Sequence, residues 1–348
     1  MKIAFLLGSL YIGGAQRVVT NITSKLAESS HTIYLITGKA GNNEYGISPK
    51  VNRVILMKNR LLMDIISVRA FLIKKGIDIC VAVCIYEEIV LSMANFHLRT
   101  KTVLSERSAP QQALYSNKIK ILRWIFFRRA DYFVFQTDEA KSFYSKKIQK
   151  RSAVIPNPVK ENLPYREQSN KEFVAVGRLE KVKNYDLLMN AFYEVHKVHP
   201  EYKLKIFGTG NEKGYLLKLK AQLKLEGCVL FEGFHRNVHE KIKNSDIFVM
   251  TSDYEGMPNA LLEAMAMGFP VISTDCPVGA PREMIIDGYS GILVPVGHKE
   301  KLVEAMKRLI EENDLKDKLG RNAFERSKDY SIDIIEKQWT DMFEELIS

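Results

Sequence analysis

Two glutamates, Glu255 and Glu263, stand eight residues apart in the stretch SDYEGMPNALLEAMAMGFPVIST. Pro258 suits a first helical turn, and the backbone N–H groups at the start of such a helix bind anions. A phosphate bound there leaves both carboxylates to accept hydrogen bonds from hydroxyl groups, a combination that a nucleotide diphosphate sugar supplies. Two ordinary surface glutamates remain the alternative. The predicted donor-binding residues of this stretch are Glu255, Gly256, Met257, Asn259 and Glu263.

Cations and glycines in three other loops could complete such a site. In GRLEKVKN, Arg178 and Lys183 lie five residues apart, and together they could neutralise a diphosphate; a solvated basic loop is the alternative. In FGTGNEKG, Gly208 marks a tight turn, which is weak evidence by itself. In GSLYIGGAQRV, Gly13 and Gly14 would let the backbone approach a ligand in a cleft between domains, although the loop is not a Walker A motif.

The elements that position these loops alternate between strand-like and helical runs, which is typical of a doubly wound parallel sheet. Seven strand-like runs precede the polar, proline-containing piece NPVKENLPYREQSNK, and six follow it. We therefore expect two Rossmann-like α/β domains that face a cleft. The predicted organisation is a first domain over residues 1–157, a linker over 158–171, a second domain over 172–330, and a final helix over 331–348 that crosses back to the first domain.

Composition and charge point to a cytoplasmic protein with a basic first half. The chain of 348 residues is 46% hydrophobic and 26% charged, and its four cysteines form no secreted disulfide pattern. The formal net charge is +10. Residues 1–157 carry 24 Lys and Arg against 10 Asp and Glu, so the first half suits an anionic membrane, nucleic acid or a phosphorylated substrate.

A membrane surface is the favoured partner for that charge, because no nucleic-acid motif accompanies it. Residues 117–129, NKIKILRWIFFRR, contain five basic residues and no acidic ones. On a helical wheel, Lys120, Arg123 and Phe127 form one stripe with Trp124 beside it, and such a mixed basic and aromatic face suits an anionic bilayer. A solvated basic helix is the alternative. We predict peripheral association with the inner face of the membrane.

The order of these motifs resembles the family-4 retaining glycosyltransferases, which have the GT-B fold. The resemblance rests on GGAQRV, IPNPV, GRLEKVKNYDLLMNAF, the two glutamates of EGMPNALLE, AMAMGFPVI and DGYSGILVP, and it covers nearly the whole chain. The sequence is similar in particular to the bacterial branch of this family that builds capsules, exopolysaccharides or lipid-linked oligosaccharides.

The resemblance implies that Arg178 and Lys183 hold the donor diphosphate, Glu263 binds ribose and Glu255 binds the transferred sugar. The implied reaction moves a sugar from a nucleotide diphosphate sugar, expected to be a UDP-sugar, to a hydroxyl of a polyprenyl-diphosphate-linked glycan with retained configuration. No Asp-x-Asp motif occurs in the sequence, and neither a metal nor a cofactor is expected.

One stretch departs from the family pattern. Many relatives have a histidine at the end of a first-domain strand, whereas VLSERSAP has Arg107 there, with Glu106 before it. We therefore predict Glu106 and Arg107 as acceptor-side candidates, with a plain surface pair as the alternative, and assign no general base. His235 and His239 have i,i+4 spacing but lack a third ligand, so they do not predict a metal site. Two rival functions remain, a UDP-N-acetylglucosamine 2-epimerase and a catalytically silent partner subunit.

Overall fold

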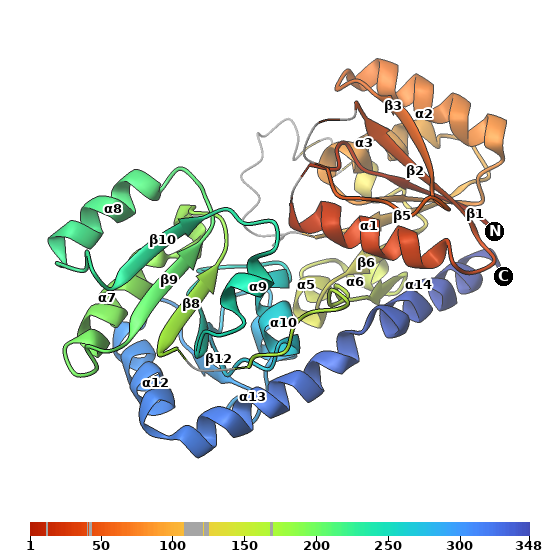
Figure 1. Ribbon diagram of the computed structural model, residues 1–348. Helices are drawn as coiled ribbons and strands as arrows, with labels where there is room; N and C mark the ends of the chain where they lie inside the picture. Colours follow the sequence, from red (N-terminus) through yellow and green to blue (C-terminus); the bar gives the residue numbers. More distant parts are fainter. Residues whose placement is uncertain (12, 40, 42–43, 108–120, 122–124, 168–169) are drawn as a thin grey trace. The chain divides into compact units, whose positions relative to one another are not determined.

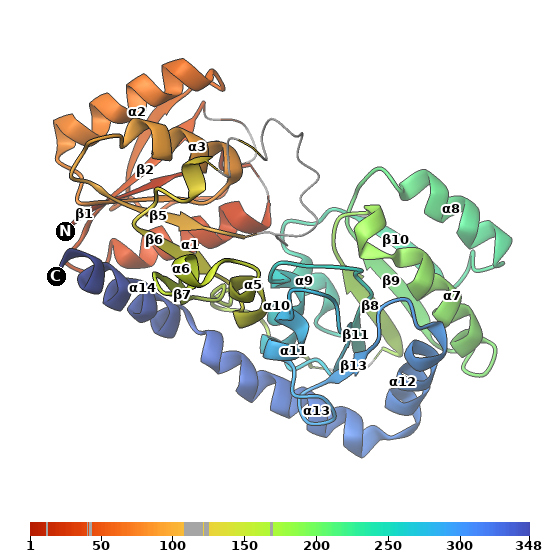
Figure 2. The same cartoon turned by 180° about the vertical axis from the view of Figure 1, so that it is seen from behind.

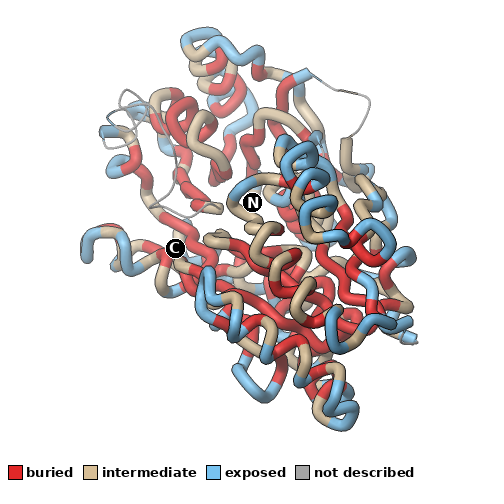
Figure 3. The backbone as a smooth tube through the Cα atoms, turned by 90° about the vertical axis from the view of Figure 1, so that its left-hand side faces the viewer, coloured by how far each residue is buried: buried red, intermediate tan, exposed pale blue. Residues whose placement is uncertain are grey.

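The computed structural model divides into two compact units, each built on one parallel sheet (Figures 1 and 2). The first unit comprises Met1–Pro158 together with Ser331–Ser348, and the second comprises Val159–Tyr330. In the tube drawing, buried stretches alternate with exposed ones along the backbone (Figure 3). The structure describes residues 1–11, 13–39, 41, 44–107, 121, 125–167 and 170–348.

The first unit contains a seven-stranded parallel sheet in the order β3-β2-β1-β4-β5-β6-β7. The register is regular through the centre, where Phe5 of β1 lies opposite Leu35 of β2 and Val81 of β4. All seven strand-like runs of the first half of the sequence form these strands, which confirms the predicted doubly wound α/β class. The strands are β1 (Lys2–Leu6), β2 (Thr32–Gly38), β3 (Asn52–Met57), β4 (Ile79–Ala82), β5 (Lys101–Ser105), β6 (Tyr132–Phe135) and β7 (Ser152–Val154).

Helices cover both faces of this sheet because side chains alternate between the faces along each strand. Ile3, Phe5 and Leu35 belong to one core, which they share with helices α1 and α14. Tyr34 points to the opposite face and meets Phe71 of α2 edge-on, with ring centroids 5.4 Å apart. The helices of this unit are α1 (Gly14–Leu26), α2 (Leu61–Lys75), α3 (Ile85–Ala94), α5 (Asp138–Ser142), α6 (Lys146–Gln149) and α14 (Ile332–Ile347).

The last helix, α14, supplies part of the first unit's core. Trp339 is fully buried and lies 5.9 Å from the ring of Phe5 and 5.5 Å from the ring of Phe343. Ile335 packs into the same cluster. Residues from the extreme end of the chain therefore fill the space under the first strand.

The second unit contains a six-stranded parallel sheet in the order β10-β9-β8-β11-β12-β13. The six strand-like runs of the second half of the sequence form it, again as predicted. The strands are β8 (Glu172–Val176), β9 (Lys203–Phe207), β10 (Val229–Gly233), β11 (Ile247–Met250), β12 (Val271–Thr274) and β13 (Ile292–Val294).

Two hydrophobic cores lie on the two faces of the second sheet. Phe173 of β8 belongs to one core, which it shares with α7, α8 and α12, while the next residue, Val174, belongs to the other with α9, α10 and α11. Leu319 of α13 packs into the first core and Ala323 into the second. The helices are α7 (Tyr185–His196), α8 (Lys213–Gln222), α9 (Val238–Ile242), α10 (Asn259–Ala266), α11 (Ala280–Met284), α12 (Lys299–Glu311) and α13 (Asn313–Ser327), with 3-10 turns η1 (Lys181–Lys183) and η2 (Lys328–Tyr330).

The segment expected to link the domains lies against the second unit where it is described. The side chains of Val159 and Leu163 pack against the core that contains α10. Arg166 contacts the carboxylates of Asp246, at 3.5 Å, and Asp317, at 3.2 Å.

The predicted membrane-facing stripe is wrong at Phe127. This side chain is buried, and its ring lies 4.6 Å from that of Phe133 and 5.2 Å from that of Tyr144. A large aromatic residue next to the β6 core is more stable there than in water. The other three members of the stripe, Lys120, Arg123 and Trp124, lie outside the described residues.

Candidate functional site

The predicted residues of the second unit collect at one edge of its sheet. The carboxyl ends of parallel strands share an edge, and in open α/β sheets ligands bind there. The loop after β8 contains Arg178 and leads to η1 with Lys183, while the loop after β11 contains Glu255 and leads to α10. β8 and β11 are neighbours in the sheet, so the two loops emerge side by side.

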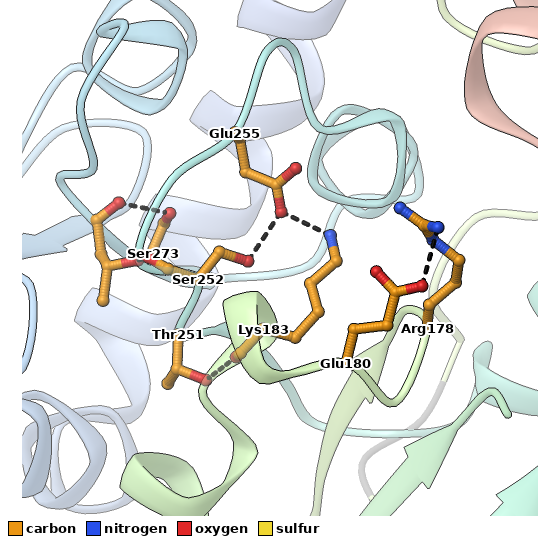
Figure 4. Close-up of polar contacts among 8 residues, drawn as sticks. Arg178, Glu180, Lys183, Thr251, Ser252, Glu255 and Ser273 are labelled. Atoms are coloured by element: carbon orange, nitrogen blue, oxygen red, sulfur yellow. Dashed lines mark hydrogen bonds and ion pairs between the residues drawn. The ribbon is translucent and has the colours of Figure 1, made fainter. Parts of the chain in front are cut away.

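Lys183 and Glu255 form an ion pair at this edge (Figure 4). The ammonium Nζ of Lys183 contacts Oε1 of Glu255, across 72 residues of sequence. The hydroxyl of Ser252 donates a hydrogen bond to the same oxygen at 2.7 Å. The two charged side chains are 18% and 15% exposed, so both are held in place yet remain open to a ligand. Because both contacts use Oε1, the geometry leaves Oε2 as the atom directed away from the pair (Figure 4).

Three polar residues that the sequence analysis missed bring the two loops together. Thr251 donates its hydroxyl to the carbonyl of Lys183 at 3.0 Å. Asn184 donates its side-chain amide to Asp253 at 2.6 Å, and its Oδ1 accepts the N–H of Leu187 at the start of α7. Asn184 has φ 48°, a left-handed conformation that asparagine tolerates better than most residues. The sequence feature that could have indicated this role is an asparagine directly before a helical run.

Arg178 does not join the Lys183–Glu255 pair. Its guanidinium contacts the carboxylate of Glu180 at 2.8 Å, and its side chain is 74% exposed. The two predicted cations therefore differ: Lys183 is fixed beside a carboxylate, whereas Arg178 belongs to an exposed pair that solvent screens.

Gly208 has a structural reason to be glycine. Its φ is 141°, and a Cβ atom there would lie 1.9 Å from the carbonyl oxygen of Gly177. Its own N–H donates to the carbonyl of Gly233 at 2.8 Å. Gly208 thus lets the loops after three adjacent strands pack closely at this edge.

The helix that follows Glu255 begins beside the ion pair. Pro258 is the N-cap of α10, and a proline offers no side-chain acceptor to the amides of the first turn. Asn259 is the first helical residue, and Gly256 lies between it and Glu255. The Met257 side chain is buried in the core, so any role of this residue at the edge belongs to its backbone. The positive end of the α10 dipole favours an anion here.

Glu263 lies deeper than Glu255 and has a buried histidine partner. His239 of α9 contacts Oε2 of Glu263 through Nε2 at 2.8 Å, and both residues are buried. Lys160 Nζ lies 3.5 Å from Nδ1 of the same ring. In the tautomer with its hydrogen on Nε2, His239 donates to Glu263, and Nδ1 is the acceptor that faces the Lys160 ammonium. The sequence analysis had considered His239 only as a metal ligand. No cluster of three or more metal-binding side chains occurs within the described ranges.

The acceptor-side candidates of the first unit are not a surface pair. Glu106 is buried and accepts the Tyr144 hydroxyl at 3.1 Å. Arg107 donates to Ser105 at 2.9 Å and to Asn157 at 2.6 Å. Burial lowers the pKa of the Arg107 guanidinium to about 10. Both side chains therefore help to organise the end of β5.

The glycine loop of the first unit is tied to a glutamate that the sequence analysis missed. Gly13 is the N-cap of α1 and Gly14 its first residue. At the start of this loop, the N–H of Gly8 donates to Oε1 of Glu87 at 2.7 Å. Glu87 is buried in α3, and its Oε2 has no hydrogen-bond partner among the described residues. The sequence feature that could have indicated Glu87 is the pair of glutamates in CIYEE, directly after a strand.

The buried carboxyl of Glu87 predicts a pH-dependent stability. Burial raises the pKa of the Glu87 carboxyl. At pH values above the usual glutamate pKa, the folded state therefore keeps a proton that the unfolded state has lost. The stability of the folded protein then falls as the pH rises through this range. We compare the melting temperature of Glu87→Gln with that of wild type at each pH. The difference, variant minus wild type, should therefore become more positive by about 2–4 °C between pH 4 and pH 8. Thermal denaturation across this range measures the difference. A constant difference would contradict a raised pKa.

Comparison with known proteins gives two family matches. Residues 161–326 match the model described as "Glycosyl transferases group 1", and residues 12–163 match "Glycosyltransferase Family 4". The chain is 31% identical over 289 residues to an uncharacterized glycosyltransferase of Methanocaldococcus jannaschii, covering 69% of this chain and 71% of that one.

Two further proteins match almost end to end. An alpha-1,4-N-acetyl-D-galactosaminyltransferase of Campylobacter jejuni, named for a PP-undecaprenol-linked glycan, is 24% identical over 366 residues and covers 99% of both chains. The crystal structure of Anabaena HepE in complex with UDP-glucose superposes with a TM-score of 0.83 at 18% identity, over 99% of this chain and 100% of that one. This superposition establishes the same two-sheet fold.

Proposed function

This chain belongs to the family-4 glycosyltransferases with the GT-B fold, and from that premise we propose that it transfers a sugar from a nucleotide diphosphate sugar to a glycan hydroxyl. The observation that carries the proposal is the Lys183–Glu255 ion pair at the carboxyl edge of the second sheet. In this pair, Lys183 supplies a cation that can bind a diphosphate, and Glu255, directly beside it, supplies a carboxylate that can bind a sugar hydroxyl.

In the proposed site, the second unit binds the donor. Lys183 and the first turn of α10, with Gly256, Met257 and Asn259, hold the diphosphate. Oε2 of Glu255 accepts a hydrogen bond from the transferred sugar, while Oε1 keeps its contact with Lys183. Glu263 accepts from the ribose, and His239 positions it for that contact.

Arg178 joins the diphosphate by leaving Glu180. An exposed ion pair contributes only about 0–1 kcal/mol, so exchanging this carboxylate for a doubly charged diphosphate is favourable. Gly208 shapes the same edge by allowing the loop contact with Gly177. In the reaction, the bond between the anomeric carbon and the diphosphate oxygen breaks and a bond to the acceptor hydroxyl oxygen forms with retained configuration. The proton of that hydroxyl passes to the departing diphosphate. The leaving charge is stabilised by Arg178, Lys183 and α10 without a metal.

The first unit is the proposed acceptor side. Its acceptor-side candidates, Glu106 and Arg107, follow β5 at the carboxyl edge of the first sheet. Gly13 and Gly14, which we propose approach the donor, open α1 at the same edge. We propose a UDP-sugar donor, supported by the fold shared with a UDP-glucose complex. A lipid-linked glycan is the proposed acceptor, supported by the C. jejuni relative. Within the described part of the chain, none of the helices could span a bilayer. We place the enzyme on the cytoplasmic face of the membrane, held by its basic first unit.

A panel of UDP- and GDP-sugars, scored by thermal shift with and without magnesium, tests the donor assignment. A donor at about 100 times its Kd stabilises the folded protein by about 2.7 kcal/mol, which raises the melting temperature by several degrees. We expect one UDP-sugar to do so without magnesium. Lys183→Ala should lose the shift, whereas Lys181→Ala, in the same turn, should keep it. Equal shifts for both variants would contradict the assigned phosphate site.

Product analysis then separates the rival activities. With the donor and a lipid-linked acceptor, NMR of the product reports whether the anomeric configuration is retained. A new sugar nucleotide formed without acceptor would indicate an epimerase. A donor-induced shift without turnover on any tested acceptor would indicate a silent partner.

A further inference from the structure

The outer face of helix α2 in the first unit is apolar where a helix on a water-exposed surface is normally polar. Its inner side packs on the sheet through Val68, Phe71 and Leu72, which are buried. The outer side carries apolar side chains that repeat every three to four residues or multiples of that spacing. They share this face with Arg69, whose guanidinium donates to the carbonyls of Ala94 and Phe96. The apolar members are Leu62 (72% exposed), Met63 (45%), Ile66 (67%) and Ile73 (59%).

The charges around this face are all of one sign. Lys58 and Arg60 precede the helix, and Lys74 and Lys75 close it; all four are exposed. The helix contains one acidic residue, Asp64, and its side chain is directed inward. The Asp64 carboxylate accepts the backbone N–H groups of Lys58, at 2.8 Å, and Arg60, at 3.2 Å. No exposed carboxylate of α2 therefore opposes an anionic surface.

Apolar side chains between two cationic ends match an anionic lipid bilayer better than they match a protein groove. A helix lying in the membrane interface places its apolar side chains at the boundary of the acyl chains and its lysines and arginines at the phosphates. The surplus of 24 Lys and Arg over 10 Asp and Glu in residues 1–157 adds long-range attraction to such a surface.

The position of α2 also suits the proposed reaction. α2 begins just after β3 ends, at the carboxyl edge of the first sheet, and it lies beside α3 (Figures 1 and 2). The Tyr86 hydroxyl at the start of α3 donates to Asp64 at 2.7 Å, and the next residue, Glu87, holds the Gly8 loop. The exposed Leu62 and Met63 thus belong to the same end of the unit as the proposed acceptor side.

We propose that the face formed by Leu62, Met63, Ile66 and Ile73, with its flanking Lys and Arg residues, docks on an anionic lipid bilayer. This placement deepens the proposed function and rests on it, since the same bilayer would present a lipid-linked acceptor.

Co-sedimentation with vesicles tests the docking face. Wild type should pellet with phosphatidylglycerol-containing vesicles and not with pure phosphatidylcholine. The double variant Leu62→Gln, Ile66→Gln should lower the bound fraction at least about tenfold, since two exposed apolar side chains no longer enter the interface. The matched variant Tyr215→Gln, Leu217→Gln, which changes two exposed apolar residues of α8, should bind like wild type.

The same samples separate this proposal from the proposed function. Because the changed residues are exposed, both double variants should keep the wild-type melting temperature and any donor-induced shift. Vesicle binding that depends on Leu62 and Ile66, without any donor shift, would support docking and overturn only the donor assignment. Equal vesicle binding by wild type and the α2 variant would overturn the docking face. So would self-association through α2 in place of vesicle binding.

Discussion

Replacing Glu255 by glutamine is expected to lower the turnover number by at least about 100-fold while leaving the fold intact. Glutamine has nearly the same shape, so the loop between β11 and α10 loses no packing. The amide carries no charge, and one of its two polar atoms is a donor instead of an acceptor. The contacts with Lys183 and with a sugar hydroxyl both need acceptor oxygens, so one of them is lost.

The measurement is kcat and donor KM of purified protein with the donor found by thermal shift. A loss mainly in kcat indicates that the carboxylate acts in the transition state, whereas a loss mainly in KM indicates ground-state binding. Glu194→Gln is the matched control, because Glu194 is also paired with a lysine, Lys197, at 2.8 Å, but on the exposed surface of α7. We expect its activity to stay within about twofold of wild type. A near-normal kcat for Glu255→Gln would remove Glu255 from the mechanism.

Trp339→Ala is expected to destabilise the first unit by about 3–5 kcal/mol, since it removes a fully buried indole and leaves a cavity. Two phenylalanine rings and the guanidinium of Arg107, 5.7 Å from the indole, lose their neighbour. The helix α14 then retains less apolar contact with α1 and the sheet. Chemical denaturation followed by circular dichroism measures the change, with the second unit as an internal reference.

Trp339→Phe is the informative companion variant. The indole Nε1 finds no hydrogen-bond acceptor within the described residues, so phenylalanine removes an unsatisfied buried donor along with some volume. We expect a cost below about 1.5 kcal/mol. If alanine and phenylalanine cost the same, the stabilisation would not come from filling this space. If neither variant changed the unfolding transition, α14 would not support the first core.

The fold class was predictable because it depends on local patterns. Short apolar runs such as DIFVMTS, bounded by turn residues and separated by helical segments, indicate a parallel sheet wherever they occur. The thirteen strands of the described residues arise in this way, in sheets of seven and six. The candidate residues Lys183 and Glu255 could also be predicted from the sequence, because each follows a strand and the carboxyl ends of parallel strands share an edge.

The partners of those residues were not predictable in the same way. His239 belongs to a five-residue helix, and its contact with Glu263 depends on how α9 and α10 pack on one face of the sheet. Arg107 was predicted with Glu106 as an acceptor-side candidate, with a surface pair as the alternative, and its hydrogen bond to Asn157, 50 residues later in the chain, was not predicted. Spacing within one segment carries no information about such distant neighbours.

The alternation of strands and helices, the order of the two halves and the basic character of the first half all follow from the amino-acid sequence alone. Which side of each helix meets the core depends on how the elements pack together. Helix α2 is apolar on both sides, so its periodicity does not distinguish the face against the sheet from the face in solvent. Phe127 was assigned to the wrong side for the same reason. A side chain's free energy depends on what lies against it, and only packing against neighbouring elements specifies that environment.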